Sequence, residues 1–182
     1  MKKIIILTAI GKDRPGIVAG VSKVLYETGC NIEDSSMTRL GNDFAMILMV
    51  QLSTKTSPEA LDKKLQPLRK KLGLSITLRV LSAAELKEET TVNVIPHMLS
   101  VYGSDKPGIV FQIAKFLAAN KINITDVQTK IAHPKLNPVY IMMLEVDVPK
   151  AVNLAKITRE LADLAQELSI DVNLKPIESY QL

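Results

Sequence analysis

The sequence Gly11-Lys12-Asp13-Arg14-Pro15-Gly16-Ile17-Val18 recurs later in the chain as Gly103-Ser104-Asp105-Lys106-Pro107-Gly108-Ile109-Val110. The two stretches are 92 positions apart, and from Gly11 to Asp34 the two copies share 11 of 24 residues. That agreement is too high for chance and indicates an internal duplication. The period is longer than that of solenoid repeats, so we interpret each copy as a domain.

The duplication continues through the second half of each copy. After a four-residue insertion the offset becomes 96, and the leucines at 61, 65, 68 and 72 align with Ile157, Leu161, Leu164 and Leu168. The predicted domains cover residues 1–81 and 91–182, joined by an acidic and polar linker at 82–90. Domains of this size, about 80 to 90 residues, can just build a core of their own.

Each copy shows the pattern of strand, helix, strand, strand, helix, strand. In the first copy, Pro15 suits the first turn of a helix that extends to Gly29, and Pro58 begins a second helix with its leucines on one stripe. Gly41-Asn42-Asp43 is a hairpin signal. The predicted strands are at 3–10, 30–40, 44–52 and 74–81. In the second copy, two prolines predict a longer and stiffer hairpin loop at 132–138.

This order predicts an α+β fold of the ferredoxin-like type. Right-handed crossovers place the four strands in one antiparallel sheet with both helices on one face. The sheet edges must be covered or paired, so we expect the protein to form a homo-oligomer.

Composition places the chain among globular proteins. Apolar residues make up 47% of it, which is too apolar for intrinsic disorder. No apolar run approaches the roughly 20 residues that span a bilayer, so we expect no membrane insertion. The single cysteine, Cys30, cannot form an intrachain disulfide and suits the reducing cytoplasm, where we expect the protein.

Direct nucleic-acid binding is not expected. The formal net charge is +4, with acidic and basic residues interspersed. The predicted fold can bind RNA by stacking bases on aromatic residues of the sheet, but only 4% of the residues are aromatic. The densest basic cluster lies on the polar side of the second helix, at Lys63, Lys64, Arg69, Lys70 and Lys71. We interpret it as a solvated face, with a partner or nucleic-acid surface as the alternative.

The repeated motif resembles the ACT domain. The resemblance rests on Gly-x-Asp-Arg-Pro-Gly-Ile-Val, followed by Val21-Ser22, Leu25 and Gly29-x-Asn31-Ile32. It covers both copies, and it is closest to the branch that includes the glycine cleavage system transcriptional repressor. Similar ACT domains also occur as appendages on enzymes with a separate catalytic domain, for which we expect no room in this chain. The resemblance thus implies two tandem ACT domains and no enzyme activity.

The resemblance also implies where a ligand binds. In ACT domains the usual site lies between the loop after the first strand and the start of the second strand, often at an interface between domains. In the first copy these positions are Asp13, Arg14, Pro15, Gly16, Ile17, Asn31 and Ile32. In the second copy they are Asp105, Lys106, Pro107, Gly108, Ile109, Asn123 and Ile124. The implied ligand is an amino acid, such as glycine, or a similar small molecule.

Elementary chemistry supports such a site. A helix N-terminus offers free N–H groups to a carboxylate, and a glycine there lets the backbone approach closely. Asn31 can both donate and accept. The alternative is that Asp13-Arg14-Pro15-Gly16 is only a strand-to-helix turn in which Asp13 caps the helix, and the two roles are compatible. Because Lys106 replaces Arg14, the two sites need not be equivalent.

Catalytic, metal and cofactor sites are not expected. Cys30 with His97 or His133 has the residue types of a nucleophile and base, but Cys30 aligns with Ile122 and His97 with Ile5. Both therefore occupy apolar or strand positions. Two histidines and one cysteine far apart in sequence also lack the spacing of metal ligands.

Together these observations predict a non-enzymatic regulator that senses a small ligand and acts through a protein partner, by resemblance a transcription factor. A second interpretation is a small-molecule-binding accessory subunit of a metabolic enzyme. A third is an enzyme in its own right, such as an acylphosphatase-like hydrolase, which the fold alone does not exclude.

Overall fold

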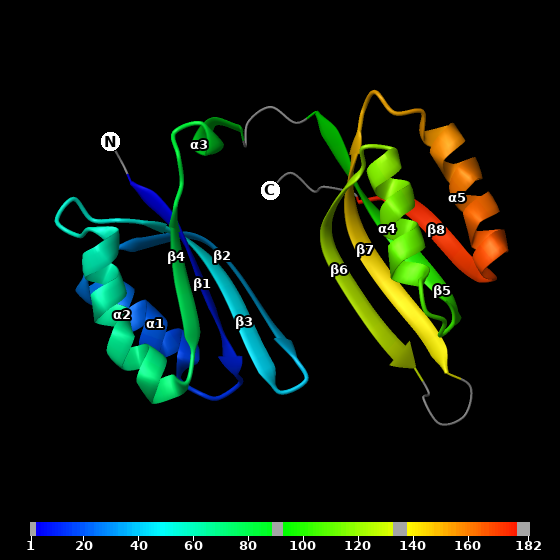
Figure 1. The fold of residues 1–182 in the computed structure, drawn as a ribbon. Coiled ribbons are helices and arrows are strands. Elements are labelled where there is room, and N and C mark those ends of the chain that lie inside the picture. The colour runs from blue at the N-terminus through cyan, green and yellow to red at the C-terminus, as the bar shows by residue number, and fades with distance from the viewer. Residues whose placement is uncertain (1–2, 89–92, 133–137, 178–182) are drawn as a thin grey trace. The chain divides into compact units, whose positions relative to one another are not determined.

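The computed structural model describes residues 3–88, 93–132 and 138–177, and the chain divides into two compact units, Met1–Glu89 and Thr90–Leu182 (Figure 1). Each unit repeats the order strand, helix, strand, strand, helix, strand. In each unit four antiparallel strands form one sheet. The predicted ferredoxin-like α+β fold is therefore confirmed for both copies.

The first unit has the strand order β2-β3-β1-β4, with two long helices on one face of the sheet (Figure 1). Its elements are β1 (Ile4–Lys12), α1 (Ile17–Glu27), β2 (Asn31–Leu40), β3 (Asp43–Gln51), α2 (Pro58–Leu72) and β4 (Ser75–Val80). The predicted hairpin is present, because β2 ends at Leu40 and β3 begins at Asp43. Strand β2 is an edge strand, and all of its residues are exposed.

The core of the first unit follows from two periodicities. Every second residue of β1, at Ile5, Leu7 and Ala9, is fully buried, as period two requires of a strand with one covered face. The helical stripe of α2 supplies Leu61 and Leu65, which are also fully buried. Burying a leucine or isoleucine side chain stabilises the fold by about 1.5–3 kcal/mol, so each of the four leucines and isoleucines contributes to the unit's stability.

Helix α2 begins and ends as its sequence indicates. The Ser57 hydroxyl accepts a hydrogen bond from the Ala60 N–H at 3.2 Å, and Pro58 occupies the first turn, where its missing N–H has no consequence. Gly73 ends the helix with φ 65° in the left-handed region.

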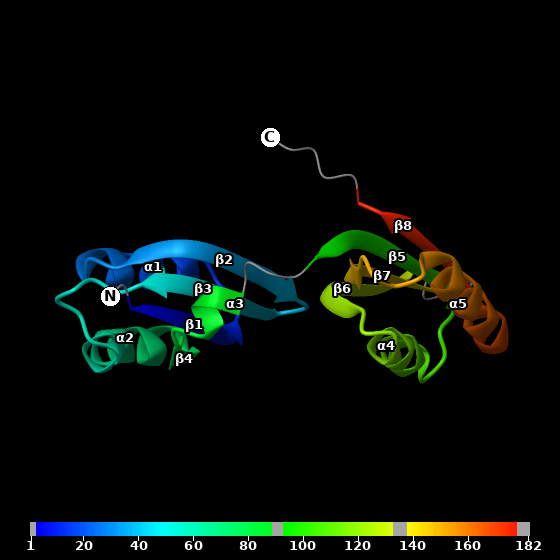
Figure 2. The same ribbon diagram turned by 90° about the horizontal axis from the view of Figure 1, so that it is seen from above.

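The second unit repeats this arrangement with the strand order β6-β7-β5-β8, and Figure 2 shows α4 and α5 against one face of the sheet. Its elements are β5 (Val94–Ser104), α4 (Ile109–Ala119), β6 (Asn123–Ala132), β7 (Val139–Pro149), α5 (Leu154–Leu168) and β8 (Ile170–Pro176). Most of the predicted loop at 132–138 lies outside the described residues.

The predicted linker contains a short helix, α3 (Glu85–Glu88). The Glu85 carboxylate accepts hydrogen bonds from the N–H and the hydroxyl of Ser82, each at 2.8 Å. The Ser82 hydroxyl in turn accepts one from the Glu85 N–H at 3.3 Å. This reciprocal pair is a capping box, which satisfies amide groups that would otherwise lack partners at the start of the helix.

Within the described ranges, no helix is both long and apolar enough to cross a bilayer.

Candidate ligand-binding site

The loop after β1 turns into α1 through a glycine in the left-handed conformation. Gly16 is the N-cap residue, with φ 94° and ψ −2°. A Cβ at this position would meet no atom within 4 Å, so the backbone angle, and not lack of space, requires glycine. No side chain accepts a hydrogen bond at this helix start, and the loop residues from Lys12 to Gly16 are exposed. The first-turn N–H groups of α1 are thus left for water or a ligand.

The second copy has the same geometry. Gly108 is the N-cap of α4, with φ 99° and ψ −10°, and no side chain caps it. The residue after each glycine is buried: Ile109 is 3% exposed, and Ile17 in the first copy is 2% exposed. The two loops therefore present equivalent backbones, although Lys106 replaces Arg14.

A titratable side chain lies near the second loop. Burial raises the pKa of the Tyr140 hydroxyl above its ordinary value, and the nearby negative charge of Asp105 raises the pKa further. Tyr140 pairs with Gly103, at the end of β5 that leads into the loop. Its neutral hydroxyl contacts the Met142 sulfur at 3.7 Å, so this group faces the core and not a ligand.

The predicted capping of α1 by Asp13 is wrong. The N–H of Asp13 donates to the Asn42 carbonyl oxygen at 2.8 Å, and its carboxylate pairs with Arg39, with Nη1 and Oδ2 3.6 Å apart. Asp13 is therefore directed to the β2–β3 hairpin. Pro15 also precedes the helix, which begins at Ile17, because the left-handed Gly16 takes the N-cap position.

The two halves of the predicted site do not come together within one copy. Lys12, at the C-terminal end of β1, pairs with Asp43. Asn31 pairs with Gln51, and Gln51 pairs with Ile4 at the N-terminal end of β1, so Asn31 lies at the opposite end of the sheet from the loop. The 11 residues of α1 separate Gly16 from Asn31, and at 1.5 Å per residue that helix is about 16 Å long. A single amino acid cannot reach from the loop to Asn31 of the same copy.

The end of the sheet that contains Asn31 or Asn123, called the asparagine end, is alike in the two copies. Asn31 and Asn123 are exposed at the start of β2 and β6, and each strand has a β-bulge shortly afterwards, at Ile32/Asp34 and Ile124/Asp126. Bulges are frequent beside functional sites, where they redirect a side chain. The Asn31 side-chain amide donates to the Glu33 carboxylate at 3.0 Å.

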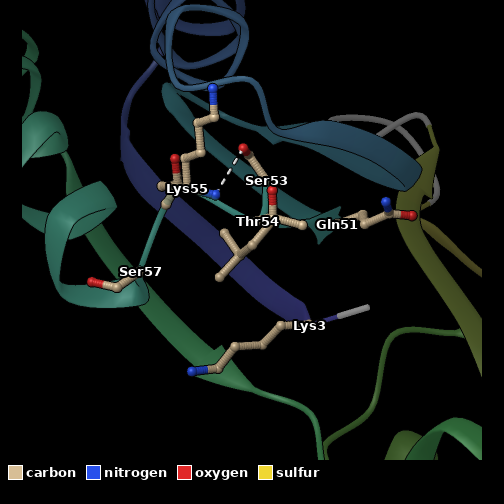
Figure 3. A pocket seen from close by; sticks show the side chains of 8 residues that line it. Lys3, Gln51, Ser53, Thr54, Lys55 and Ser57 are labelled. Carbon is tan, nitrogen blue, oxygen red and sulfur yellow. Dashed lines mark hydrogen bonds between the residues drawn. The ribbon is translucent and has the colours of Figure 1, made fainter. Parts of the chain in front are cut away.

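A hollow of about 640 Å³ lies at this asparagine end of the first unit, and sequence reasoning missed it (Figure 3). Lys3 and the segment from Gln51 to Ser57 line it. The many hydroxyl side chains of this segment were the one feature of the sequence that could have pointed to the hollow. The N–H of Lys55 donates to the Ser53 hydroxyl at 3.2 Å. Figure 3 shows the amino groups of Lys3 and Lys55 pointing in opposite directions, so these two charges do not converge on one ligand position.

The rejected catalytic pair lies in two different units. His97 is 2% exposed, and its Nδ1 lies 2.9 Å from the Ile95 carbonyl oxygen. Cys30 is partly buried, with its sulfur 3.4 Å from the Thr28 hydroxyl. His133 lies outside the described residues. Among the described residues, no group of three His, Cys, Asp or Glu side chains is placed to hold a metal ion.

Comparison with known proteins gives the same family for both units. The family described as "ACT domain" matches residues 3–79 and again residues 97–165. A UPF0237 protein of Methanopyrus kandleri is 45% identical over 75 residues, which are 41% of this chain and 83% of that protein.

Two further proteins are similar over nearly the whole chain. The glycine cleavage system transcriptional repressor of Escherichia coli is 25% identical over 184 residues, covering 97% of this chain and 92% of the repressor. The crystal structure of an unknown protein from Galdieria sulphuraria has a TM-score of 0.80 at 27% identity, covering 98% of this chain and all of that one. The tandem arrangement itself is therefore shared, and not only the single domain.

Proposed function

Because the chain belongs to the ACT-domain family and contains two copies of the domain, we propose that it is a non-enzymatic regulatory protein that senses an amino acid. It acts by contact with a partner protein. The similarity to the glycine cleavage system transcriptional repressor over 97% of the chain supports a transcription factor as that partner and glycine as the first ligand to test.

The duplicated left-handed glycine supports ligand sensing most directly. Gly16 and Gly108 adopt φ and ψ angles within 10° of each other, and neither helix start has a side-chain cap. A residue other than glycine would cost about 1–2 kcal/mol in this conformation. The uncapped N–H groups and the positive end of the helix dipole suit a ligand carboxylate. The exposed cations Arg14 and Lys106 add to that attraction.

Selective capture of partners tests this proposal. The full chain, fixed to a resin, is incubated with native cell extract in the presence and absence of glycine, and bound proteins are identified by mass spectrometry. The expected result is a transcription factor whose capture changes with glycine. A metabolic enzyme captured in this ligand-dependent way would favour an accessory subunit instead, and a capture profile unaffected by any amino acid would contradict ligand sensing.

A further inference from the structure

The helices of the first unit pack closely because α1 has a glycine where it crosses α2. A Cβ added to Gly20 would lie 2.7 Å from Leu68 Cδ1 and 3.5 Å from Leu72 Cδ1. The side chains of α2 therefore fill the space above Gly20. A small residue at a helix crossing allows this close approach, since contact distance depends on the side chains at the crossing.

The second unit has Gln112 at the position of Gly20, and its helices pack less closely than α1 and α2. A groove of about 430 Å³ lies between α4 and α5, with Gln112 among its lining residues. The remaining lining residues are Lys115, Phe116, Ala119 and Asn120 on α4, and Glu160, Asp163, Leu164 and Glu167 on α5. At this position the residue type and the helix packing differ between the two copies.

The groove combines an apolar floor with one negative wall, which α5 forms. Phe116 and Leu164 are partly buried against the core beneath it. Three carboxylates of α5 line it against the one lysine, Lys115, whose ammonium lies 5.9 Å from the ring centroid of Phe111. Among the described residues, Glu160 forms an ion pair with Lys156, and no ion pair involves Asp163 or Glu167.

Two of the three aligned positions of the first copy have the opposite charge, and the third is a neutral proline. With the offset of 96, Glu160, Asp163 and Glu167 correspond to Lys64, Pro67 and Lys71. The acidic character is therefore a property of the second copy and not of the fold. An apolar floor beside a row of carboxylates is complementary to an amphipathic segment with basic side chains along one edge.

We propose that the groove between α4 and α5 binds a basic, amphipathic segment of the partner protein. Its apolar side chains contact Phe116 and Leu164, and its lysines or arginines face Asp163 and Glu167. The inference rests on the proposed function, in which the chain acts through a partner, and it places that contact on the second unit.

Helix α2 of a second copy is the other basic candidate, and its chemistry fits less well. Its exposed face bears Lys63, Lys64, Lys70 and Lys71, but none of the large hydrophobic residues that are exposed in the described structure lies on α2. That face can meet the carboxylates without filling the apolar floor. A partner segment with both kinds of side chain satisfies both parts of the groove.

Two synthetic peptides test the proposal. Each peptide has about 14 residues, enough for four helical turns, with leucines at positions i, i+3 and i+7. The basic peptide has lysines beside the leucines, and the acidic peptide has glutamates at the same positions. Binding of the fluorescein-labelled peptides to the full chain is measured by fluorescence anisotropy. The basic peptide should bind and its acidic twin should not. Asp163→Lys with Glu167→Lys should weaken binding of the basic peptide about ten-fold or more.

Matched control variants distinguish an effect of the groove from an effect of net charge or of side-chain size alone. Glu145→Lys with Asp171→Lys makes the same change in net charge at exposed residues of β7 and β8, and should alter affinity by less than about two-fold, because salt screens distant charges. Ala119→Trp should block the groove, whereas Ala118→Trp, exposed on α4 outside the lining, should not.

Three results would overturn the inference. The first is equal binding of the basic peptide by the wild type and the Asp163→Lys, Glu167→Lys variant. The second is an equal loss in the control pair. The third is self-association of the wild type, measured by sedimentation velocity, that this groove variant abolishes, since the occupant would then be a second copy. Calorimetric titration of the same samples with glycine distinguishes failure of the groove from failure of ligand sensing.

Discussion

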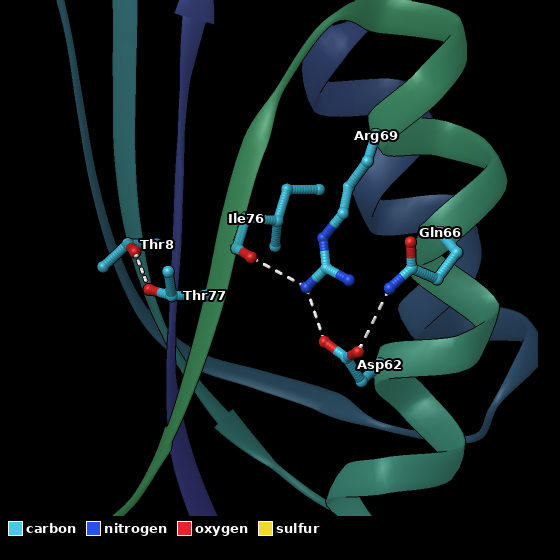
Figure 4. Close-up of polar contacts among 6 residues, drawn as sticks. All are labelled: Thr8, Asp62, Gln66, Arg69, Ile76 and Thr77. Carbon is cyan, nitrogen blue, oxygen red and sulfur yellow. Dashed lines mark hydrogen bonds and ion pairs between the residues drawn. The ribbon is translucent and has the colours of Figure 1, made fainter.

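Nη2 of Arg69 donates a hydrogen bond to the Ile76 carbonyl oxygen at 2.7 Å, which joins α2 to β4 (Figure 4). The same nitrogen donates to the Asp62 carboxylate, two turns earlier on α2. Only 17% of the Arg69 side chain is exposed. The prediction that the basic cluster is a solvated face is therefore wrong for Arg69, because this position of the helix faces β4.

Arg69→Met should destabilise the first unit by about 1–3 kcal/mol, since the Ile76 carbonyl oxygen loses a charged donor. Lys70→Met, at the exposed neighbouring position, should change the stability by no more than about 0.5 kcal/mol. Urea unfolding followed by circular dichroism measures both. Equal stabilities of the two variants would show that the Arg69 contacts contribute nothing.

The pKa of Glu85 should show whether the capping box of α3 forms. Hydrogen bonds from the Ser82 N–H, the Arg79 guanidinium and the Ser82 hydroxyl lower the pKa of Glu85 from 4.5 to about 2. Because the folded pKa lies below the unfolded one, the capping stabilises α3 fully above pH 4.5 and is lost as the pH falls from 4.5 toward 2. A carboxyl-detected NMR titration of Glu85 should show the low midpoint, and Ser82→Ala should raise it. A wild-type midpoint near 4.5 would mean that the box does not form in solution.

Gly11→Ala should destabilise the first unit by about 1–3 kcal/mol through overpacking. A Cβ there would lie 2.9 Å from the Gly73 carbonyl oxygen, a backbone atom that cannot move aside on its own. Gly103→Ala in the second unit should cost less, since the backbone atom nearest to the added Cβ, Ile170 Cα, lies 3.2 Å away, although Ile170 Cγ2 lies at 2.7 Å. Denaturant unfolding of the two variants compares the costs, and a larger loss for Gly103→Ala would contradict this ranking.

The fold was predictable because the duplication shows each signal twice. Strand and helix periods, the Gly41-Asn42 hairpin and the Pro58 helix start all appear in the structure. The linker helix was missed, although Ser82-Ala83-Ala84-Glu85 is a capping-box sequence, because its polar composition was interpreted as an unstructured connection. In this segment the capping-box sequence predicts the structure better than the polar composition does.

The candidate site was predictable only in part. Family resemblance selected Gly16 and Asn31, but their separation follows from sheet register and from the length of α1, which motif spacing does not reveal. The partner of Asp13 could not be predicted either, because Arg39 comes from a hairpin that is distant in sequence. The groove between α4 and α5 depends on how far two helices stand apart, a property of packing that motif spacing does not reveal.

Amino-acid binding at the two glycine loops can be measured directly. Isothermal titration calorimetry with glycine and a panel of amino acids is run on the wild type, on the variant Gly16→Val with Gly108→Val, and on Asn31→Ala with Asn123→Ala. Gly29→Val is the control, since Gly29 also has a positive φ of 69° but lies at the other end of α1. Thermal melts establish that each variant is folded.

The result we predict is that the wild type binds an amino acid, that the double glycine variant binds it at least about ten-fold more weakly, and that Gly29→Val binds it as the wild type does. A further loss in the asparagine variant would add Asn31 and Asn123 to the site. Binding that survives in a folded Gly16→Val, Gly108→Val protein would contradict the placement of the site. A wild type that binds no amino acid at all would contradict ligand sensing itself, and the repeated motif would then be only a strand-to-helix turn.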